Sequence, residues 1–265
     1  MAKIKYIDSS RLKRAILAGA SCVVSDKDYL NKINVFPVPD GDTGTNMVFT
    51  LNSIVEGIEQ SDTNTIHGLL NEIADHALDG ARGNSGAILA QFFQGLNEGY
   101  SGDKLRMYPK DLADSVKHAS RMSREALSNP VEGTIITVID DFSSSLNELV
   151  NQTECFQTII SEGLKASEKS LNNTPNLLPI LKKSGVYDSG AKGFVDFLYG
   201  INEYILDGLI ERDEDENKLN INTEAEHKNN HNFLNEKEIK YQYCIECKIS
   251  NENVDIKNVK NDLMN

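Results

Sequence analysis

Residues 34–47 read NVFPVPDGDTGTNM, and they place two carboxylates, Asp40 and Asp42, on a short loop that leads into an apolar-periodic segment. The two prolines of this stretch fix their own φ angles and favour extended geometry in the residues before them, so the chain reaches Asp40 as a stiff segment. Gly41 then permits a sharp turn between the two acids. Carboxylates that converge at the start of a helix are hard oxygen ligands, which Mg²⁺ takes together with substrate phosphates.

Two simpler readings of the Asp-Gly-Asp sequence have to be weighed against a magnesium site. An EF-hand calcium loop starting at Asp40 is excluded, because Thr45 stands where that loop needs glycine and Leu51 stands where it needs a bidentate glutamate. A plain turn in which an Asp or Thr caps the following helix remains an alternative. The stretch alone therefore leaves a turn and a magnesium site open.

A second segment, residues 80–89, reads GARGNSGAIL and puts four small residues ahead of an apolar run. Backbone N–H groups at such a helix start bind phosphate oxygens, although small residues equally let helices pack closely. Arg82 is the cation beside this loop. One hypothesis is that it stabilises charge on a transferred phosphate, and the alternative is a surface or structural role. The sequence contains no Walker A Gly-Lys-Ser/Thr and no HRD or DFG set of protein kinases.

Two later segments repeat the pattern of a glycine-bearing turn followed by an apolar stretch. They are PVEGTIITV at 130–138 and SGVYDSGAKGF at 184–194. Either alone is compatible with a helix cap. Together, the four segments resemble the DhaL domain of the dihydroxyacetone kinase L-subunit superfamily, most closely the N-terminal ATP-binding domain of the bacterial fatty acid kinase A subunit. The resemblance runs from about Arg11 to Leu209 and includes NTPNLLPILKKSGVYDSGAKG.

The resemblance implies ATP and two Mg²⁺ ions as cofactors. Asp40 and Asp42 are the implied metal ligands, and Asn34 lies near the position of a further aspartate in the sugar kinase branch. Asp40, Asp42 and Arg82 are the implied catalytic residues. Two residues depart from the family pattern. Tyr187 stands where the pattern has a smaller residue, and Ala191 stands where it has glycine. The residues implied to contact the nucleotide, its phosphates or metal-bound water are Thr43, Gly44, Thr45, Asn46, Gly83, Asn84, Ser85, Gly86, Thr134, Asp188 and Gly190.

The implied activity is phosphoryl transfer from ATP to the carboxylate of a fatty acid that a separate fatty-acid-binding subunit presents, which gives an acyl phosphate. One alternative is a subunit that phosphorylates dihydroxyacetone on a partner. The other is an ATP-binding regulatory protein without turnover. In this family the parts beyond the ATP-binding domain are expected to mediate dimerisation and partner docking. We therefore expect a homodimer only in a longer form, and little acyl phosphate from this chain alone.

Composition narrows the class of protein. A chain of 265 residues with 39% hydrophobic residues can bury a sizeable core, and its net charge of −13 argues against binding nucleic acid or an anionic membrane surface. No run of about 18 apolar residues occurs, so no integral membrane association is predicted and a cytoplasmic location is expected. The four cysteines are too few and too scattered for a disulfide framework, and Cys244 and Cys247 form a single CxxC without a second pair.

Hydrophobic periodicity predicts an all-α antiparallel bundle or barrel of about eight helices. The loop that carries Asp40 and Asp42, here called the metal loop, and the glycine-bearing turns of the other three segments are expected at one end of it. Three parts are expected: a helical domain at 1–210, a polar linker at 211–236, and a truncated β-containing start of a middle domain at 237–265. Asp8 or Ser9 is available to cap the first helix. Helix-period apolar faces occur near 9–25, 44–60, 64–79, 84–98, 109–127, 133–150, 154–171, 175–183 and 191–210.

Overall fold

The computed structural model describes residues 4–207 and Val259, and within these residues it is helical, with no strand. A single antiparallel bridge joins Ile7 to Met107. The nine helices of the described part are α1 (Ser9–Ile33), α2 (Thr43–Glu59), α3 (Ile66–Gly80), α4 (Gly83–Gly99), α5 (Pro109–Glu125), α6 (Ile135–Leu149), α7 (Phe156–Leu177), α8 (Pro179–Ser184) and α9 (Ser189–Asp207).

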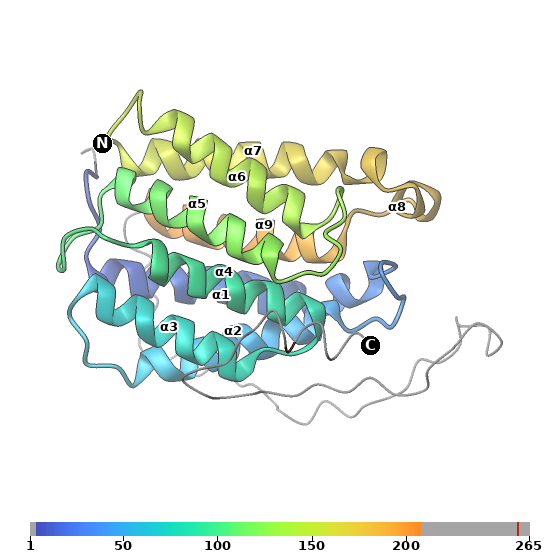
Figure 1. Ribbon diagram of the computed structural model, residues 1–265, viewed down its shortest axis with the longest axis horizontal. Helices are drawn as coiled ribbons and strands as arrows, with labels where there is room; N and C mark the ends of the chain where they lie inside the picture. Colours follow the sequence, from blue (N-terminus) through green and yellow to red (C-terminus); the bar gives the residue numbers. More distant parts are fainter. Residues whose placement is uncertain (1–3, 208–258, 260–265) are drawn as a thin grey trace. The chain divides into compact units, whose positions relative to one another are not determined.

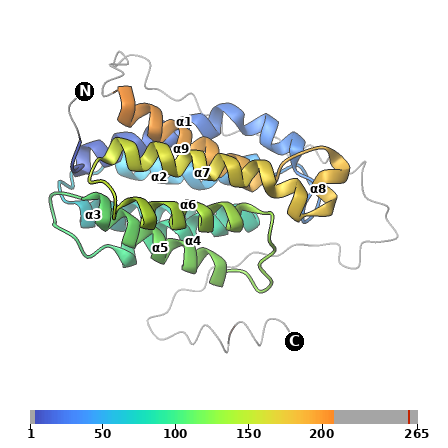
Figure 2. The same ribbon diagram turned by 90° about the horizontal axis from the view of Figure 1, so that it is seen from above.

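Eight long helices form a closed ring. From α1 to α7 each helix packs against the next one in the sequence, and α9 closes the ring between α7 and α1 (Figures 1 and 2). The short helix α8 packs against α7 at the edge of this ring. Short connections make neighbouring helices antiparallel, as in other helical bundles. The predicted all-α barrel of about eight helices is thus confirmed.

The apolar faces of these helices meet in one continuous core. Phe194 of α9 lies at its centre, with its ring centroid 5.2 Å from that of Phe92 and 6.0 Å from that of Phe142, both in edge-on contact. Full burial of a large apolar side chain contributes about 1.5–3 kcal/mol. The apolar stripe of the last helix is therefore core, as its spacing predicts.

Two helix boundaries differ from the predictions. Helix α1 continues to Ile33 rather than ending near residue 25, because Leu30 and Ile33 extend its buried face. Helix α7 runs through Pro175, so the predicted helix at 175–183 is divided between the end of α7 and α8. Pro175 cannot donate to the carbonyl of Leu171. The Thr174 hydroxyl donates to that carbonyl instead, at 2.8 Å, which explains how the helix tolerates the proline.

The expected linker at 211–236 and the expected β-containing segment at 237–265, with Cys244 and Cys247, lie outside the described residues apart from Val259. Among the helices that are described, none has both the length and the apolar character needed to cross a membrane.

The ring closes where α1 and α9 approach each other through glycines. A Cβ on Gly200 would lie 2.4 Å from the carbonyl oxygen of Ala18 and 2.8 Å from the Cα of Gly19. A Cβ on Gly19 would lie 2.8 Å from the carbonyl oxygen of Phe197. These neighbours are backbone atoms, which cannot swing aside as a flexible side chain can.

We expect Gly200→Ala to lower the free energy of unfolding by about 1–3 kcal/mol, because the strain of the added methyl exceeds the roughly 1 kcal/mol that alanine gains over glycine in a helix. Urea unfolding followed by circular dichroism measures this change. Ser144→Ala, on the exposed side of α6, is the matched control and should be neutral or slightly stabilising. A Gly200→Ala variant as stable as the wild type would show that the two helices are not in close contact.

Candidate active site

The segments that carry the predicted site residues meet at one end of the helix ring. This end holds the C-terminus of α1 and the N-termini of α2, α4, α6 and α9, on the right in Figure 1. Two contacts confirm that these segments adjoin. The hydroxyl of Ser189 donates to the carbonyl of Leu30 at 2.6 Å, and a Cβ on Gly83 would lie 2.4 Å from Nδ2 of Asn46. The prediction that the metal loop and the glycine turns gather at one end is confirmed.

The loop between α1 and α2 is built around Asn34 and Asp40. Asn34 is the C-cap of α1 and is buried, and its Nδ2 donates to Oδ1 of Asp40 at 2.6 Å. Gly41 then makes the turn with φ of +69°, a backbone conformation that favours glycine. The Oδ1 of Asn34 is buried and has no hydrogen-bond partner. A buried oxygen without a donor is costly unless a further group satisfies it.

The two carboxylates of this loop influence each other. The pKa of Asp42 is raised above its usual value, first because the carboxyl group loses hydration and then because the negative charge of Asp40 lies nearby, while a hydrogen bond from Asn46 acts in the opposite direction. Like charges held close together favour a bound cation. Asp40 and Asp42 are both exposed, so a ligand can reach them.

The donors present fit a magnesium ion. No group of three or more His, Cys, Asp or Glu side chains able to hold a metal occurs in the described part of the chain. Two carboxylates and the unpartnered amide oxygen of Asn34 make up the set instead. Mg²⁺ is commonly bound through one or two carboxylates, with waters and substrate phosphates completing its octahedron. The set thus suits Mg²⁺, whose remaining coordination positions waters or a phosphate ligand would fill.

A side chain from α1 caps α2, a role that the sequence analysis did not anticipate. Oδ1 of Asn31 accepts from the backbone N–H of Thr45 at 3.0 Å, and its Nδ2 donates to the Thr45 hydroxyl at 2.9 Å. Asp42 occupies the N-cap position, yet its side chain makes no capping hydrogen bond. The plain-turn alternative, in which the Asp-Gly-Asp sequence exists to cap the helix, therefore lacks its expected hydrogen bond.

Several predicted phosphate-contacting residues also have a packing role. Thr43 and Gly44 are buried, and a Cβ on Gly44 would lie 2.3 Å from the carbonyl oxygen of Lys27 in α1. Gly86 packs against Thr50, whose hydroxyl oxygen would be 2.7 Å from an added Cβ. These glycines allow the helices to approach closely, and their contact with a nucleotide stays a prediction.

The start of α4 forms the other wall of the site. Gly83 has φ of +56°, and Asn84 and Ser85 follow it in the first turn. The N-cap residue, Arg82, makes no side-chain capping bond. A helix start presents backbone N–H groups and the positive end of the helix dipole, so this turn suits an anion such as a phosphate.

Arg82 itself points back along the chain. Its Nη1 donates to the carbonyl of Ala81 at 2.6 Å and to that of Asp79 at 3.3 Å, and the residue is exposed. These bonds place a positive charge at the C-terminus of α3, where the helix dipole favours it. A role in phosphoryl transfer would need the side chain to leave these carbonyls, and it stays a prediction.

Thr134, Asp188 and Gly190 lie together, as their predicted common role requires. Oδ1 of Asp188 accepts from the N–H of Ile135 at 3.0 Å and from that of Ala191 at 2.8 Å, so one carboxylate caps both α6 and α9. A Cβ on Gly190 would be 3.4 Å from that of Ile135. Burial raises the pKa of Asp188 to about 6. The methyl group of Ala191 is fully buried beside this carboxylate.

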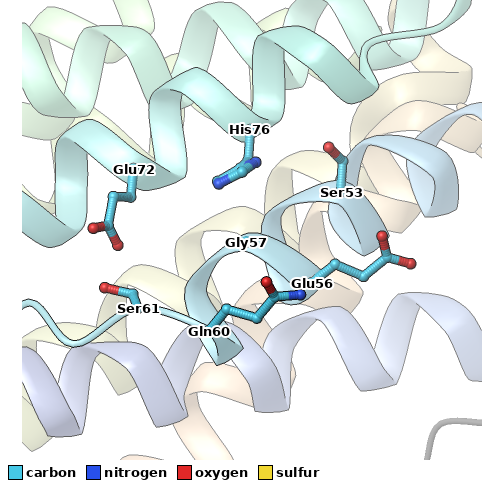
Figure 3. Close-up of a pocket in the computed structure, with 7 residues that line it drawn as sticks. All are labelled: Ser53, Glu56, Gly57, Gln60, Ser61, Glu72 and His76. Carbon is cyan, nitrogen blue, oxygen red and sulfur yellow. The ribbon is translucent and has the colours of Figure 1, made fainter.

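A shallow cleft lies elsewhere, between the C-terminal half of α2 and α3 (Figure 3). The ring of His76 packs over Gly57, where a Cβ would come within 1.9 Å of it. The lining contains none of the predicted site residues, and it consists of Ser53, Glu56, Gly57, Gln60, Ser61, Glu72 and His76.

Comparisons with known proteins show which family the chain resembles. The DAK2 domain model matches residues 37–203. An uncharacterized protein of Staphylococcus haemolyticus is 37% identical over 246 residues, which are 92% of this chain and 44% of that protein. Protein YloV of Bacillus subtilis is 34% identical over 244 residues, with the same coverage. The chain thus spans less than half the length of these curated relatives.

One similar solved structure is that of the dihydroxyacetone kinase from C. freundii in complex with AMP-PNP and Mg²⁺. It matches with a TM-score of 0.56 and 15% sequence identity, over 72% of this chain and 33% of that chain. At this level of identity the likeness establishes a shared fold.

The burial of Asp188 can be tested through the pH dependence of stability. Its pKa is about 6 in the folded chain against 3.8 for an ordinary aspartate, so its protonation favours the folded state. That stabilisation is complete below about pH 4 and is lost as the pH rises through 6. Asp188→Asn keeps an oxygen acceptor but does not titrate. We expect the stability of the wild type relative to this variant to fall by about 3 kcal/mol between pH 4 and pH 7.

Urea unfolding of both proteins across this range measures the difference, and Asp62→Asn, at an exposed position, is the control substitution. Parallel stability curves for the wild type and Asp188→Asn would contradict the burial of this carboxylate.

Proposed function

The chain belongs to the DAK2 domain family, and we propose that it is the ATP-binding module of a kinase that phosphorylates a fatty acid carboxylate. The single observation that carries the proposal is the pair of carboxylates, Asp40 and Asp42, beside the unpartnered Oδ1 of Asn34. This arrangement lies at the start of α2, and the start of α4, which is suited to phosphate, adjoins it where Gly83 approaches Asn46. A polyphosphate with divalent cations satisfies the charge and the oxygen donors of such a site.

In this proposal Asp40 and Asp42 hold two Mg²⁺ ions, with Asn34 as a further ligand. When bound, the ions supply neutralising charge to the β- and γ-phosphates of ATP. The first turn of α4, with Gly83, Asn84 and Ser85, orients phosphate oxygens through its N–H groups. Thr45 and Asn46, in the first turn of α2, would meet phosphate oxygens or metal-bound water. The chain's own contribution is thus position and charge rather than a protein nucleophile.

The acceptor step is a single displacement. A carboxylate oxygen of the fatty acid forms a bond to the γ-phosphorus, the bond from that phosphorus to the β–γ bridging oxygen breaks, and ADP leaves with the electron pair. The products are ADP and an acyl phosphate, and no proton has to be removed from the attacking carboxylate. A kinase of this kind therefore needs no general base for its acceptor.

We further propose that a separate fatty-acid-binding subunit brings the acceptor. Exposed apolar side chains also lie near the site. Two of them are neighbours of site residues in the sequence, and one contacts the loop before α6. Val38 precedes the metal loop, Tyr187 precedes Asp188, and Leu177 lies against Gly133. Exposed apolar groups around a charged site are typical of a surface that a protein partner covers.

A second candidate acceptor is the hydroxyl of dihydroxyacetone. The likeness of the fold to a dihydroxyacetone kinase supports it. Asn34 in the place of an aspartate weighs against it, because the amide adds an oxygen ligand but no negative charge. An ATP-binding regulatory role without turnover is the third possibility.

Asp40→Asn and Asp42→Asn test the proposal, since they keep shape and remove charge. We expect either variant to lower acyl phosphate formation by at least about 100-fold, measured as hydroxamate after the chain is mixed with ATP, Mg²⁺ and a fatty-acid-loaded binding protein. Asp62→Asn, in the loop between α2 and α3, should keep wild-type turnover.

Three other results would argue against the proposed function. Full turnover in both variants would refute the role of the loop. Turnover with dihydroxyacetone and its binding subunit, but not with fatty acid, would favour the second candidate. Nucleotide binding without turnover on either acceptor would favour the regulatory role.

A further inference from the structure

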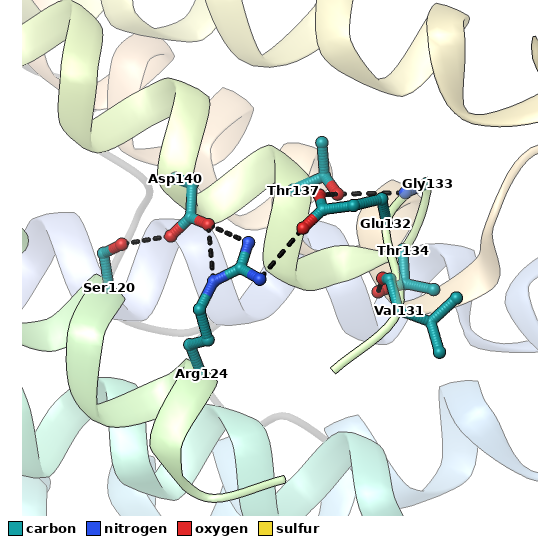
Figure 4. A network of polar contacts seen from close by, with 8 residues as sticks. All are labelled: Ser120, Arg124, Val131, Glu132, Gly133, Thr134, Thr137 and Asp140. Atoms are coloured by element: carbon teal, nitrogen blue, oxygen red, sulfur yellow. Dashed lines mark hydrogen bonds and ion pairs between the residues drawn. The ribbon is translucent and has the colours of Figure 1, made fainter. Parts of the chain in front are cut away.

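Arg124, in the last turn of α5, ties the loop that follows it to α6 (Figure 4). Its guanidinium donates to Oδ2 of Asp140 from two nitrogens, Nε at 2.9 Å and Nη2. Nη1 donates to Oε1 of Glu132 at 2.9 Å. The hydroxyl of Ser120 donates to the other oxygen of Asp140. One arginine thus joins α5, α6 and the loop between them.

Thr137 continues this chain of contacts into the loop. Its hydroxyl donates to Oε2 of Glu132 at 2.6 Å and accepts from the backbone N–H of Gly133 at 2.9 Å. The Thr134 hydroxyl donates to the carbonyl of Val131 at 2.7 Å. Every residue from 131 to 134 is therefore fixed by at least one hydrogen bond.

The conformation that these bonds hold is an unusual one. Gly133 has φ of +83°, and a Cβ there would lie 2.8 Å from that of Leu177 and 3.1 Å from the carbonyl oxygen of Thr174. The N–H of Ile135, two residues further along the chain, donates to Asp188. The network therefore sets where Thr134 lies relative to Asp188.

This network can fix the position of the loop as well as contribute to stability. The side chain of Arg124 is 34% exposed, and those of Asp140 and Glu132 are 31% and 56% exposed. Isolated ion pairs at such exposure typically contribute below about 1 kcal/mol to folding, and bidentate pairs and networks contribute more. A bidentate guanidinium contact also fixes direction and distance.

We propose that Arg124, Glu132 and Thr137 are positioning residues that hold the loop 131–134 in the shape that receives the nucleotide. The inference rests on the proposed function and deepens it, because it assigns the control of nucleotide affinity to residues that do not touch the metal loop. Arg124 and Thr137 act through Glu132 and Gly133, and loss of either frees the loop to leave its place beside Asp188.

Thr137→Val tests the inference, since valine keeps the shape of threonine and removes the hydroxyl. Calorimetry gives the Kd for ATP with Mg²⁺, and electron paramagnetic resonance gives the Kd for Mn²⁺ alone at the metal loop. We expect Thr137→Val and Arg124→Gln to raise the nucleotide Kd by about tenfold, with Mn²⁺ binding within about twofold of the wild type. Thr137→Ser should restore nucleotide affinity. Arg121→Gln, one turn earlier on α5, is the matched control.

The outcomes separate this inference from the proposed function. Unchanged nucleotide affinity in both Thr137→Val and Arg124→Gln would overturn the positioning role while leaving the ATP site intact. A parallel loss of Mn²⁺ and nucleotide binding with a lower Tm would also overturn it, by showing a general structural role. A wild-type chain that binds no nucleotide would overturn the proposed function, and the inference with it.

Discussion

The close contact between α1 and α9 determines how the helices close into a ring and which segments meet at its end. Gly19 and Gly200 let the two backbones approach until an added Cβ would meet backbone atoms. This contact closes the ring and brings the first residue of α9 to the end of α1, where Ser189 bonds to Leu30. Residues separated by 159 positions in the sequence thereby meet at one end of the helix ring.

The carboxylates at that end divide into two kinds. Asp188 is buried, and two backbone N–H groups from different helices satisfy it, so it holds α6 and α9 together. Asp40 and Asp42 are exposed, and the capping of α2 that Asp42 could have supplied is performed by Asn31. A helix start that another side chain caps leaves its acidic residues available for a ligand. This division supports the proposed metal role of the loop and gives Asp188 a structural role that the sequence alone did not reveal.

Most of the architecture could be predicted from the sequence, because an amphipathic helix produces a local periodicity of apolar residues. The long apolar faces of α2 and α9 gave their positions to within a few residues. The end of α7 could not be predicted, because the hydroxyl of Thr174 compensates for Pro175 and no periodicity reports that bond. Asn31 and Arg124 were missed for a related reason. Their partners lie 14 and 16 residues away, and such pairs become visible only after the helices are packed.

We infer that this end of the ring binds ATP through magnesium. Calorimetric titration of ATP into the wild-type chain, once with Mg²⁺ and once with the ion chelated, tests it most directly. We expect saturable binding with Mg²⁺ and at least about tenfold weaker binding without it, because two carboxylates repel the phosphates when no cation lies between them. Equal affinity in both titrations, or no binding in either, would contradict it.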